Sequence, residues 1–210
     1  MISFIYFDLG GVVVDDLTGK GKWQKLMDTL GVKPEDNPAV SAIWSRYRKE
    51  LCTTRSVDTL VPILNEEVGL NLPNDYQLQE VMLDLFWTNP AIWPVLEDTQ
   101  TKTRIGLLTN MYPHMFERIT EKEIVPNIVW DKVVDSSIEG VTKPDLEIYQ
   151  LAQERATVPN ENILFVDNEP KNIDGAKAAG WQTFFYNSSD HEKSVLELKK
   201  FLAKQELIDS

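Results

Sequence analysis

Two aspartates stand directly after apolar segments that are typical of buried strands. Asp8 follows the apolar run 4–7 and precedes two glycines, and Asp167 follows the apolar run 162–166. Strands that are apolar at consecutive positions are covered on both faces, which is typical of a parallel sheet between helices. The carboxyl ends of such strands carry the reactive groups, so both acids are expected in one cleft. Paired carboxylates there bind a hard divalent cation or attack an electrophile.

The remaining apolar runs of strand length alternate with helical patterns. This alternation predicts an α/β fold, a Rossmann-like doubly wound parallel sheet with right-handed crossovers. Proline near the start of each of the first three predicted helices fits the first helical turn, where no backbone donor is lost. The predicted strands are 2–7, 104–109, 132–134, 162–166 and 183–186, and the predicted helices are 113–123, 144–156, 170–179 and 190–203.

The interval 16–90 shows helical periodicity without strand-like runs. It is too long for a simple crossover, so we expect a small all-helical cap domain of about four helices, inserted after the first strand. The α/β core then comprises residues 1–15 and 91–210. Such a cap excludes water and selects substrates. Its segment 44–49 carries basic and aromatic side chains, which fit either contact with a polar substrate or a solvated helix face.

Composition limits the partners. The 210 residues include 33 acidic and 21 basic side chains, a formal charge of −12, so the surface field repels nucleic acid and anionic membranes. A single cysteine, Cys52, excludes an internal disulfide and fits a reducing compartment. The N-terminal run lacks a basic region, and no stretch reaches membrane-spanning length. We expect a soluble, untargeted, cytoplasmic protein.

Four segments, 8–12, 107–110, 142–145 and 166–176, carry the polar residues of interest. Their order and spacing resemble the motifs of the haloacid dehalogenase superfamily of hydrolases, in the branch with a helical C1-type cap. The resemblance spans nearly the whole chain, and capped sugar-phosphate phosphatases form a similar branch.

The resemblance implies a role for each motif. Asp8 is the expected nucleophile, forming an aspartyl phosphate that divides one slow hydrolysis into two easier steps. Thr109 and Asn110 are expected to bind the phosphoryl oxygens, and Lys143 to supply positive charge to those oxygens and to Asp8. In isolation, Asp8 and Thr109 also fit turn or helix capping, and Lys143 fits a solvated loop. The Lys143–Pro144 bond is sometimes cis in this family.

The resemblance also implies a magnesium site. Its expected ligands are Asp8, the backbone carbonyl of Gly10, and Asp167, because magnesium takes hard oxygens and keeps several waters. Asn168 and Glu169 are expected to orient those waters.

Two positions depart from the family pattern. Gly10 stands where phosphatases usually carry the acid that protonates the leaving oxygen, and general acid–base help contributes about 10²- to 10⁴-fold. Either Asp15 or Asp16 could replace that acid, although exposed turn carboxylates are the default interpretation. Asn168 stands where the family often has a second aspartate, which lowers the charge available to hold magnesium.

We therefore predict a magnesium-dependent phosphatase acting on a small phosphorylated metabolite, with sugar phosphates as one candidate class. Two alternatives stay open. One is a metal-independent 2-haloacid dehalogenase, which uses the same aspartate to displace halide. The other is a catalytically weak or silent phosphate-sensing or protein-binding module, which Gly10 keeps in consideration.

Overall fold

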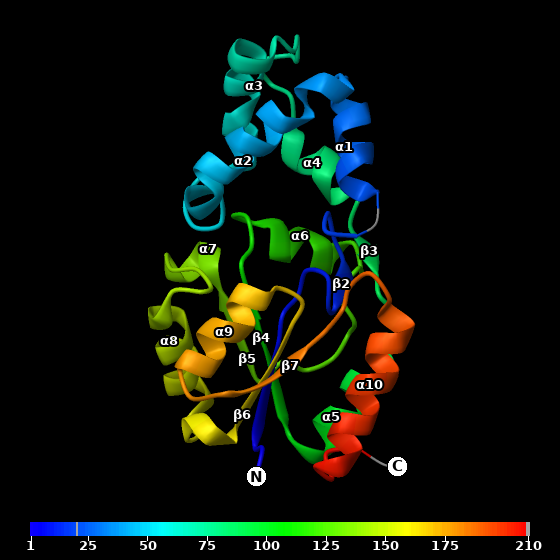
Figure 1. Cartoon of the computed structure of the whole chain (residues 1–210), viewed down its shortest axis with the longest axis vertical. Coiled ribbons are helices and arrows are strands. Elements are labelled where there is room, and N and C mark those ends of the chain that lie inside the picture. Colours follow the sequence, from blue (N-terminus) through cyan, green and yellow to red (C-terminus); the bar gives the residue numbers. More distant parts are fainter. Residues whose placement is uncertain (20, 209–210) are drawn as a thin grey trace.

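The computed structural model of the chain describes residues 1–19 and 21–208. Its centre is a parallel five-stranded sheet with the order β5-β4-β1-β6-β7 (Figure 1). This confirms the predicted α/β class. The strands are β1 (Phe4–Phe7), β4 (Arg104–Thr109), β5 (Lys132–Asp135), β6 (Ile163–Asp167) and β7 (Gln182–Phe185).

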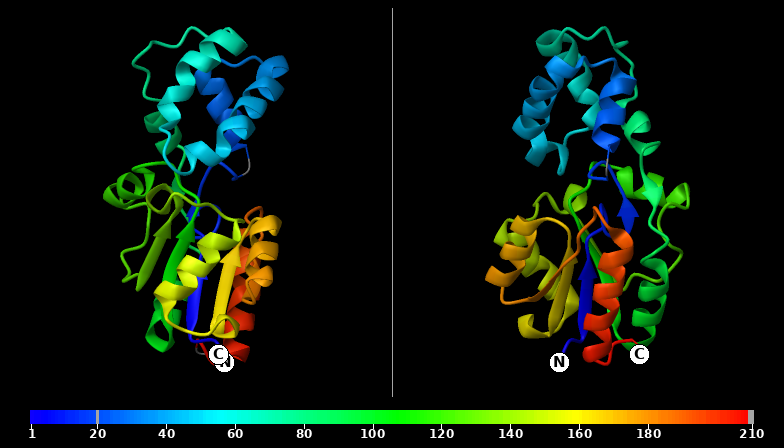
Figure 2. Two further views of the ribbon diagram at one scale, coloured as in Figure 1. Left: turned by 90° about the vertical axis from the view of Figure 1, so that its left-hand side faces the viewer. Right: turned by 45° about the vertical axis from the view of Figure 1, so that its right-hand side comes forward.

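Helices cover both faces of the sheet, as Figure 2 shows, which explains why β1 is apolar at every position. Phe4 and Tyr6 pack with α8 (Leu146–Ala156) and α9 (Pro170–Ala178) on one face, where the Tyr6 hydroxyl donates to the Ala152 carbonyl at 2.8 Å. Ile5 and Phe7 pack with α5 (Trp93–Lys102) and α10 (His191–Lys204) on the other. The other flanking helices are α6 (Met115–Glu121) and α7 (Ser136–Glu139).

A group of helices, here called the helical insertion (residues 22–83), lies beyond the carboxyl edge of the sheet (Figure 1). Its apolar faces are buried together, as the periodicity predicts. The domain limits at 15/16 and 90/91 stay a prediction. The insertion contains α1 (Lys22–Leu30), a 3-10 turn (Pro34–Asp36), α2 (Asn37–Leu51), a second 3-10 turn (Val57–Leu60), α3 (Val61–Val68) and α4 (Leu78–Leu83).

Two short antiparallel strands mark where the chain enters and leaves the insertion. In this pair, Val14 of β2 (Val14–Asp15) lies opposite Thr88 of β3 (Trp87–Thr88). Strands of two residues give no usable periodicity, and the sequence did not predict them. It also missed α5, although Pro94 and buried Val95, Leu96 and Thr99 carry a helical pattern.

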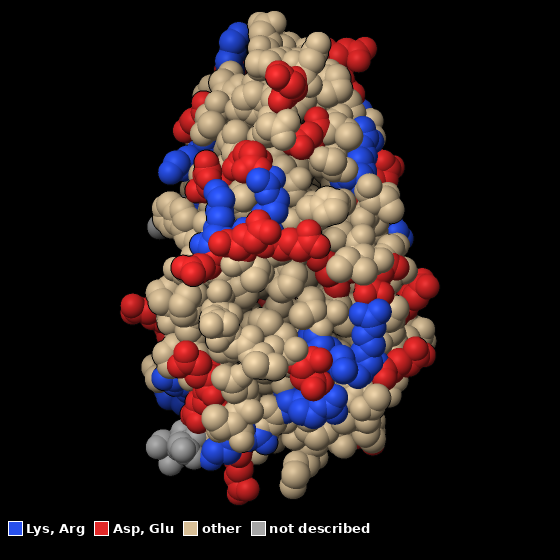
Figure 3. Space-filling model, turned by 180° about the vertical axis from the view of Figure 1, so that it is seen from behind, with Lys and Arg blue, Asp and Glu red and all other residues tan. Residues whose placement is uncertain are grey.

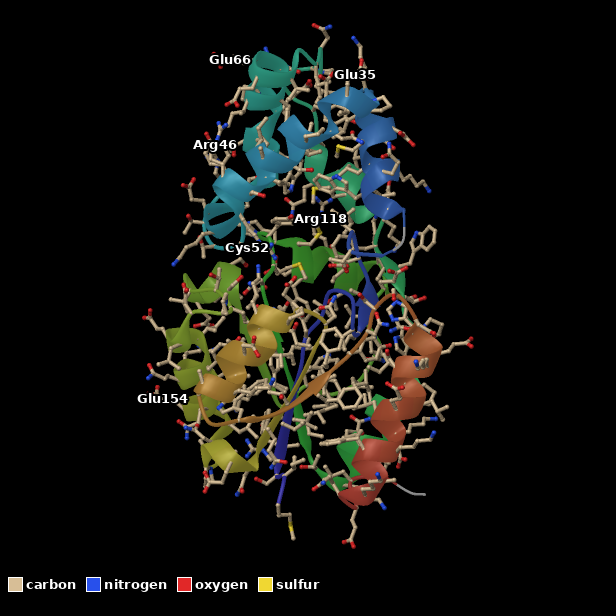
Figure 4. All side chains as sticks on the ribbon, in the orientation of Figure 1. Glu35, Arg46, Cys52, Glu66, Arg118 and Glu154 are labelled. Atoms are coloured by element: carbon tan, nitrogen blue, oxygen red, sulfur yellow. The ribbon has the colours of Figure 1, made fainter. Side chains whose placement is uncertain are left out.

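Ion pairs join the insertion to the sheet domain. Lys49 of α2 pairs with Asp145 at 2.7 Å, and Arg118 of α6 pairs with Glu80 of α4. Figure 4 shows Arg118 at the level where the two parts meet. Figure 3 shows acidic and basic side chains next to one another around the middle of the opposite face. In the described part of the chain, no helix has the length and apolar character needed to cross a bilayer.

Candidate active site

The strand order brings the predicted residues to one edge of the sheet. Because β1 lies between β4 and β6, Asp8 follows the central strand while Thr109 and Asp167 end its two neighbours. The backbone N–H of Asp8 donates to the Val166 carbonyl at 2.8 Å, which places the first acid beside the second. The chain reverses its winding direction at β1, and ligands bind at such switch points.

Lys143 connects the two acids. Its ammonium nitrogen lies 2.8 Å from Asp8 Oδ1 and 2.7 Å from Asp167 Oδ2. All three side chains are buried, with Lys143 only 3% exposed. The Lys143–Pro144 peptide bond is cis. A buried cation between two carboxylates keeps these charges fixed in position, and losing any one of them leaves an unpaired buried charge.

Burial and neighbouring charge act in opposite directions on these groups. Burial raises the pKa of Asp8, the charge of Asp167 raises it further, and Lys143 and the Leu9 N–H lower it. Burial lowers the pKa of Lys143, but Asp167 and Asp8 together outweigh that effect and raise it. The lysine therefore stays charged and offsets part of the effect of burial on Asp8, whose pKa is raised on balance.

Asp167 is held from several sides. Asn172 donates to both of its oxygens, at 3.1 and 3.3 Å, and the Glu169 N–H donates to Oδ1 at 2.7 Å. With Lys143 on Oδ2, both oxygens are engaged, and the side chain is fully buried. Its expected role as a direct magnesium ligand stays a prediction. In this geometry Asp167 is first of all the anchor of Lys143.

Asn110 fixes the backbone of Lys143. Its side-chain oxygen accepts from the Lys143 N–H at 2.8 Å, and its side-chain nitrogen donates to the Lys143 carbonyl at 2.9 Å. The carboxamide is thus committed to the lysine loop, while the residue also borders the cavity. Thr109 differs, because its buried hydroxyl has no hydrogen-bond partner among the described residues. An unpartnered buried hydroxyl is costly unless a ligand satisfies it.

A cavity of about 360 Å³ lies between the sheet edge and the helical insertion. That volume suits a small metabolite. The sheet side contributes mainly polar groups, whereas most of the aromatic side chains come from the insertion and the loops beside it, together with polar Ser41, Ser45 and Arg48. The first set includes Asp8, Gly10, Asn110, Lys143, Asn168 and Glu169, and the second includes Leu17, Trp23, Trp44, Phe86 and Tyr112.

Gly11 lies close to Asn168, which borders this cavity. Gly11 has φ +77°, and a Cβ there would overlap the Asn168 amide nitrogen and lie 3.0 Å from Cγ. Only glycine avoids both problems. The Asn168 nitrogen donates to the Ser188 hydroxyl at 3.3 Å, which leaves the carboxamide oxygen outside that bond. Asn168 borders the cavity, whereas Asp167 lies behind it.

The basic and aromatic segment 44–49 divides between the cavity and the surface. Trp44, Ser45 and Arg48 border the cavity. Arg46 instead pairs with Glu67 at 2.7 Å on the outer side of the insertion (Figure 4). Part of the segment therefore faces the cavity and part lies on the outer face of the insertion.

Cys52 also borders the cavity, at the lower end of the insertion (Figure 4). Burial raises the pKa of this thiol to about 11, so the thiol stays protonated at neutral pH. A protonated thiol is a poor nucleophile, which agrees with its interpretation as a small buried residue.

Sequence reasoning missed the aromatic wall of the cavity. Phe86 lies after α4, Tyr112 lies after β4, and Trp23 is the second residue of α1. Apolar residues at helical spacing look alike whether they pack into a core or face a cavity. One signal in the sequence could have identified Tyr112 as a cavity residue. It lies three residues after Thr109, and therefore close to the carboxyl end of a strand that carries a predicted site residue.

Comparisons with known proteins identify the family of this chain. The family model of haloacid dehalogenase-like hydrolases matches residues 2–180. The chain is 23% identical to an (S)-2-haloacid dehalogenase of Pseudomonas putida over 94% of this chain and 90% of that protein. Another relative, acyl-CoA dehydrogenase family member 10 of Mus musculus, is 28% identical over 52% of this chain. The matched region makes up only 10% of the length of that protein.

Solved structures share the fold. A predicted HAD-like family hydrolase of Porphyromonas gingivalis has a TM-score of 0.75 at 22% identity, covering 96% of this chain and 98% of that one. A variant of HAD family enzyme BT-2542 of Bacteroides thetaiotaomicron, in complex with magnesium and inorganic phosphate, has a TM-score of 0.72 at 14% identity. It covers 90% of this chain and 96% of that one. With the family model matched over most of its length, this chain belongs to the haloacid dehalogenase-like hydrolases.

Proposed function

We propose that this hydrolase is a magnesium-dependent phosphatase acting on a small phosphorylated metabolite. The observation that carries the proposal is the Asp8 carboxylate, which Lys143 holds at 2.8 Å at the floor of a small cavity. The complex of BT-2542 with magnesium and phosphate supports the same assignment for a protein of this fold. Sugar phosphates are the candidate substrates that the sequence resemblance suggests.

In the proposed reaction an oxygen of Asp8 attacks phosphorus and the bond to the leaving oxygen breaks. Lys143 balances the negative charge of the phosphoryl group, and the Thr109 hydroxyl supplies a hydrogen bond to one of its oxygens. Water then attacks the aspartyl phosphate, which releases inorganic phosphate and restores Asp8. Asn110 contributes to these reaction steps indirectly, because it fixes the backbone of Lys143.

The residues around Asp8 fit a magnesium ion with few protein ligands. Asp8 Oδ1 binds both the Leu9 N–H at 2.7 Å and Lys143, so Oδ2 lies outside these two contacts. We assign the ligand role to Asp8, the Gly10 carbonyl and the Asn168 carboxamide oxygen, since Asn168 and not Asp167 borders the cavity. Magnesium often binds through one or two carboxylates, substrate phosphate and waters. When bound, the ion neutralises phosphoryl charge.

Hydrolytic dehalogenation is the second candidate. Two observations favour it: the aromatic wall of the cavity, and the 23% identity to a 2-haloacid dehalogenase over 94% of this chain. In this reaction Asp8 attacks the carbon that carries the halogen and releases halide.

The two candidates separate in one pair of assays. Phosphate release from a panel of sugar phosphates, aryl phosphates and acyl phosphates is measured with magnesium and with EDTA. Halide release from 2-chloropropionate is measured without metal. Magnesium-dependent phosphate release that Asp8→Asn removes supports the phosphatase, and metal-independent halide release supports the dehalogenase. Activity that survives Asp8→Asn contradicts both, because both begin with attack by Asp8.

A further inference from the structure

The side-chain space at position 10 is already filled by another residue. A Cβ built on Gly10 would overlap Asp16 Oδ2 and would lie 3.1 Å from Asp16 Cγ. Asp16 therefore places a carboxylate oxygen where the first side-chain atom of an acid at position 10 would stand. Asp8, Gly10 and Asp16 all border the same cavity.

The Asp16 carboxylate is held in this place by one of its oxygens. Oδ1 accepts from the Thr18 N–H at 2.9 Å and from the Thr18 hydroxyl at 2.5 Å. Oδ2, the oxygen next to Gly10, takes part in neither bond. A carboxyl group anchored through one oxygen presents the other in a fixed direction, which a proton-transfer group requires.

The adjacent acid is directed elsewhere. Asp15 pairs with Lys22 at 2.9 Å and borders a second cavity together with Trp87 and His191. Asp15 is the last residue of β2, and Asp16 follows it outside the strand. Of the two candidate acids, only Asp16 borders the cavity that holds Asp8.

On this geometry we infer that Asp16 is the general acid and base of the site, in place of the acid that is absent at position 10. The inference rests on the proposed phosphatase function. As Asp8 attacks phosphorus, the electron pair of the breaking P–O bond passes to the leaving oxygen, which takes the proton of the Asp16 carboxyl. The Asp16 carboxylate then takes a proton from water as the water oxygen attacks phosphorus. The bond to Asp8 breaks, and both acids return to their starting states.

The test compares two substrates of similar shape, phenyl phosphate and p-nitrophenyl phosphate. Phenolate is the more basic leaving group, so its departure depends more on protonation. In Asp16→Asn, kcat/KM for phenyl phosphate should fall by about 10²- to 10⁴-fold. For p-nitrophenyl phosphate the fall should be at least tenfold smaller, because nitrophenolate leaves with little proton transfer. A folding defect would lower both values by the same factor.

A second variant moves the acid back to position 10. Gly10→Asp alone should be impaired, since the new side chain meets Asp16. Gly10→Asp combined with Asp16→Ala frees that space and should recover part of the phenyl phosphate activity lost in Asp16→Ala. Asp15→Asn is the control, because Asp15 borders the other cavity, and it should leave the ratio of the two substrates unchanged.

Three outcomes decide the role of Asp16. A selective loss on phenyl phosphate in Asp16→Asn supports the assignment. An equal loss on both substrates in a folded Asp16→Asn variant, or no loss, overturns it while leaving a phosphatase. A wild-type protein that hydrolyses neither aryl phosphate nor any phosphate of the wider panel refutes the phosphatase itself, and the role of Asp16 with it.

Discussion

The sheet wall of the cavity carries charged side chains that bind one another, whereas the insertion wall combines aromatic side chains with serine hydroxyls and an arginine. On the sheet side, Lys143 forms buried ion pairs with Asp8 and Asp167. Asn110 binds the Lys143 backbone, and Asn172 donates to the Asp167 carboxylate. On the insertion wall the charged group is Arg48, which has no carboxylate partner within the described residues. The other arginines all have one, namely Arg46, Arg55, Arg104, Arg118 and Arg155.

This difference separates the two tasks of the site. A set of buried ion pairs tolerates little change, because removing one member leaves the others unpaired in a medium of low dielectric. Aromatic side chains tolerate exchange for others of similar volume. We therefore expect substitutions on the sheet wall to affect both folding and turnover. Substitutions on the insertion wall should change which substrates bind.

Lys143→Met should have the largest effect. It leaves Asp8 and Asp167 buried and facing each other without a cation, so the free energy of unfolding should fall by about 3 to 5 kcal/mol. Activity should fall by about 10²- to 10³-fold or more, because a group that balances phosphoryl charge is lost. Urea denaturation and phosphate release measure the two effects.

The matched variant is Lys143→Met combined with Asp167→Asn. Removing one of the two facing charges should recover much of the stability and none of the activity. Recovery of both would show that Lys143 is needed only for folding. A single variant as stable as the wild type would contradict the interpretation of the ion pairs.

Asn110→Ala should come next. It leaves the N–H and the carbonyl of Lys143 without the partners they have at 2.8 and 2.9 Å, at a cost of about 1 to 3 kcal/mol. A displaced lysine should lower kcat by roughly 10²-fold with a smaller change in KM. A rise in KM alone would instead identify Asn110 as a substrate ligand. The stability and kcat of Asn110→Asp should lie between those of the wild type and Asn110→Ala. The aspartate keeps the acceptor for the Lys143 N–H and loses the donor to the Lys143 carbonyl.

The sheet wall was predictable because its residues follow from local patterns. Asp8 and Asp167 each end an apolar run, and a parallel sheet brings the carboxyl ends of neighbouring strands together. The role of Lys143 came from the family resemblance, because in isolation the residue also fits a solvated loop. The predicted helix start at 144 was two residues early, since α8 begins at Leu146. The clamp by Asn110 was not predictable, because a carboxamide that binds a ligand and one that binds the backbone look the same in a sequence.

The insertion wall and the choice between the two candidate acids needed coordinates. Asp15 and Asp16 are neighbours of identical type, and their directions are set by contacts with Lys22 and Gly10 that only the folded chain makes. Likewise, Trp23 and Phe86 follow the same helical periodicity as residues of the core. Which of them face a cavity depends on how the insertion docks.

Arg48→Ala tests the insertion wall. The unpaired guanidinium should bind an anionic group on the substrate other than the phosphate. We expect kcat/KM for 4-carboxyphenyl phosphate to fall about 10-fold, mostly through KM, as the loss of one charged hydrogen bond predicts. The value for phenyl phosphate should change little. Arg46→Ala is the control, since Arg46 lies on the same helix but pairs with Glu67. Equal effects of the two variants would contradict a binding role for Arg48.

Asn168→Asp should have the smallest effect on turnover and the clearest effect on metal. A carboxylate in place of the carboxamide adds a negative charge to the set of oxygen donors, and the magnesium concentration for half-maximal activity should fall roughly tenfold. Asn168→Ala should raise that concentration. Ser188→Ala is the control, because it removes only the group that the Asn168 nitrogen binds at 3.3 Å. If Asp167→Asn changes the magnesium concentration for half-maximal activity and both Asn168 variants leave it unaltered, Asp167 and not Asn168 is the magnesium ligand. The sheet wall would then bind metal through the same carboxylate that anchors its lysine.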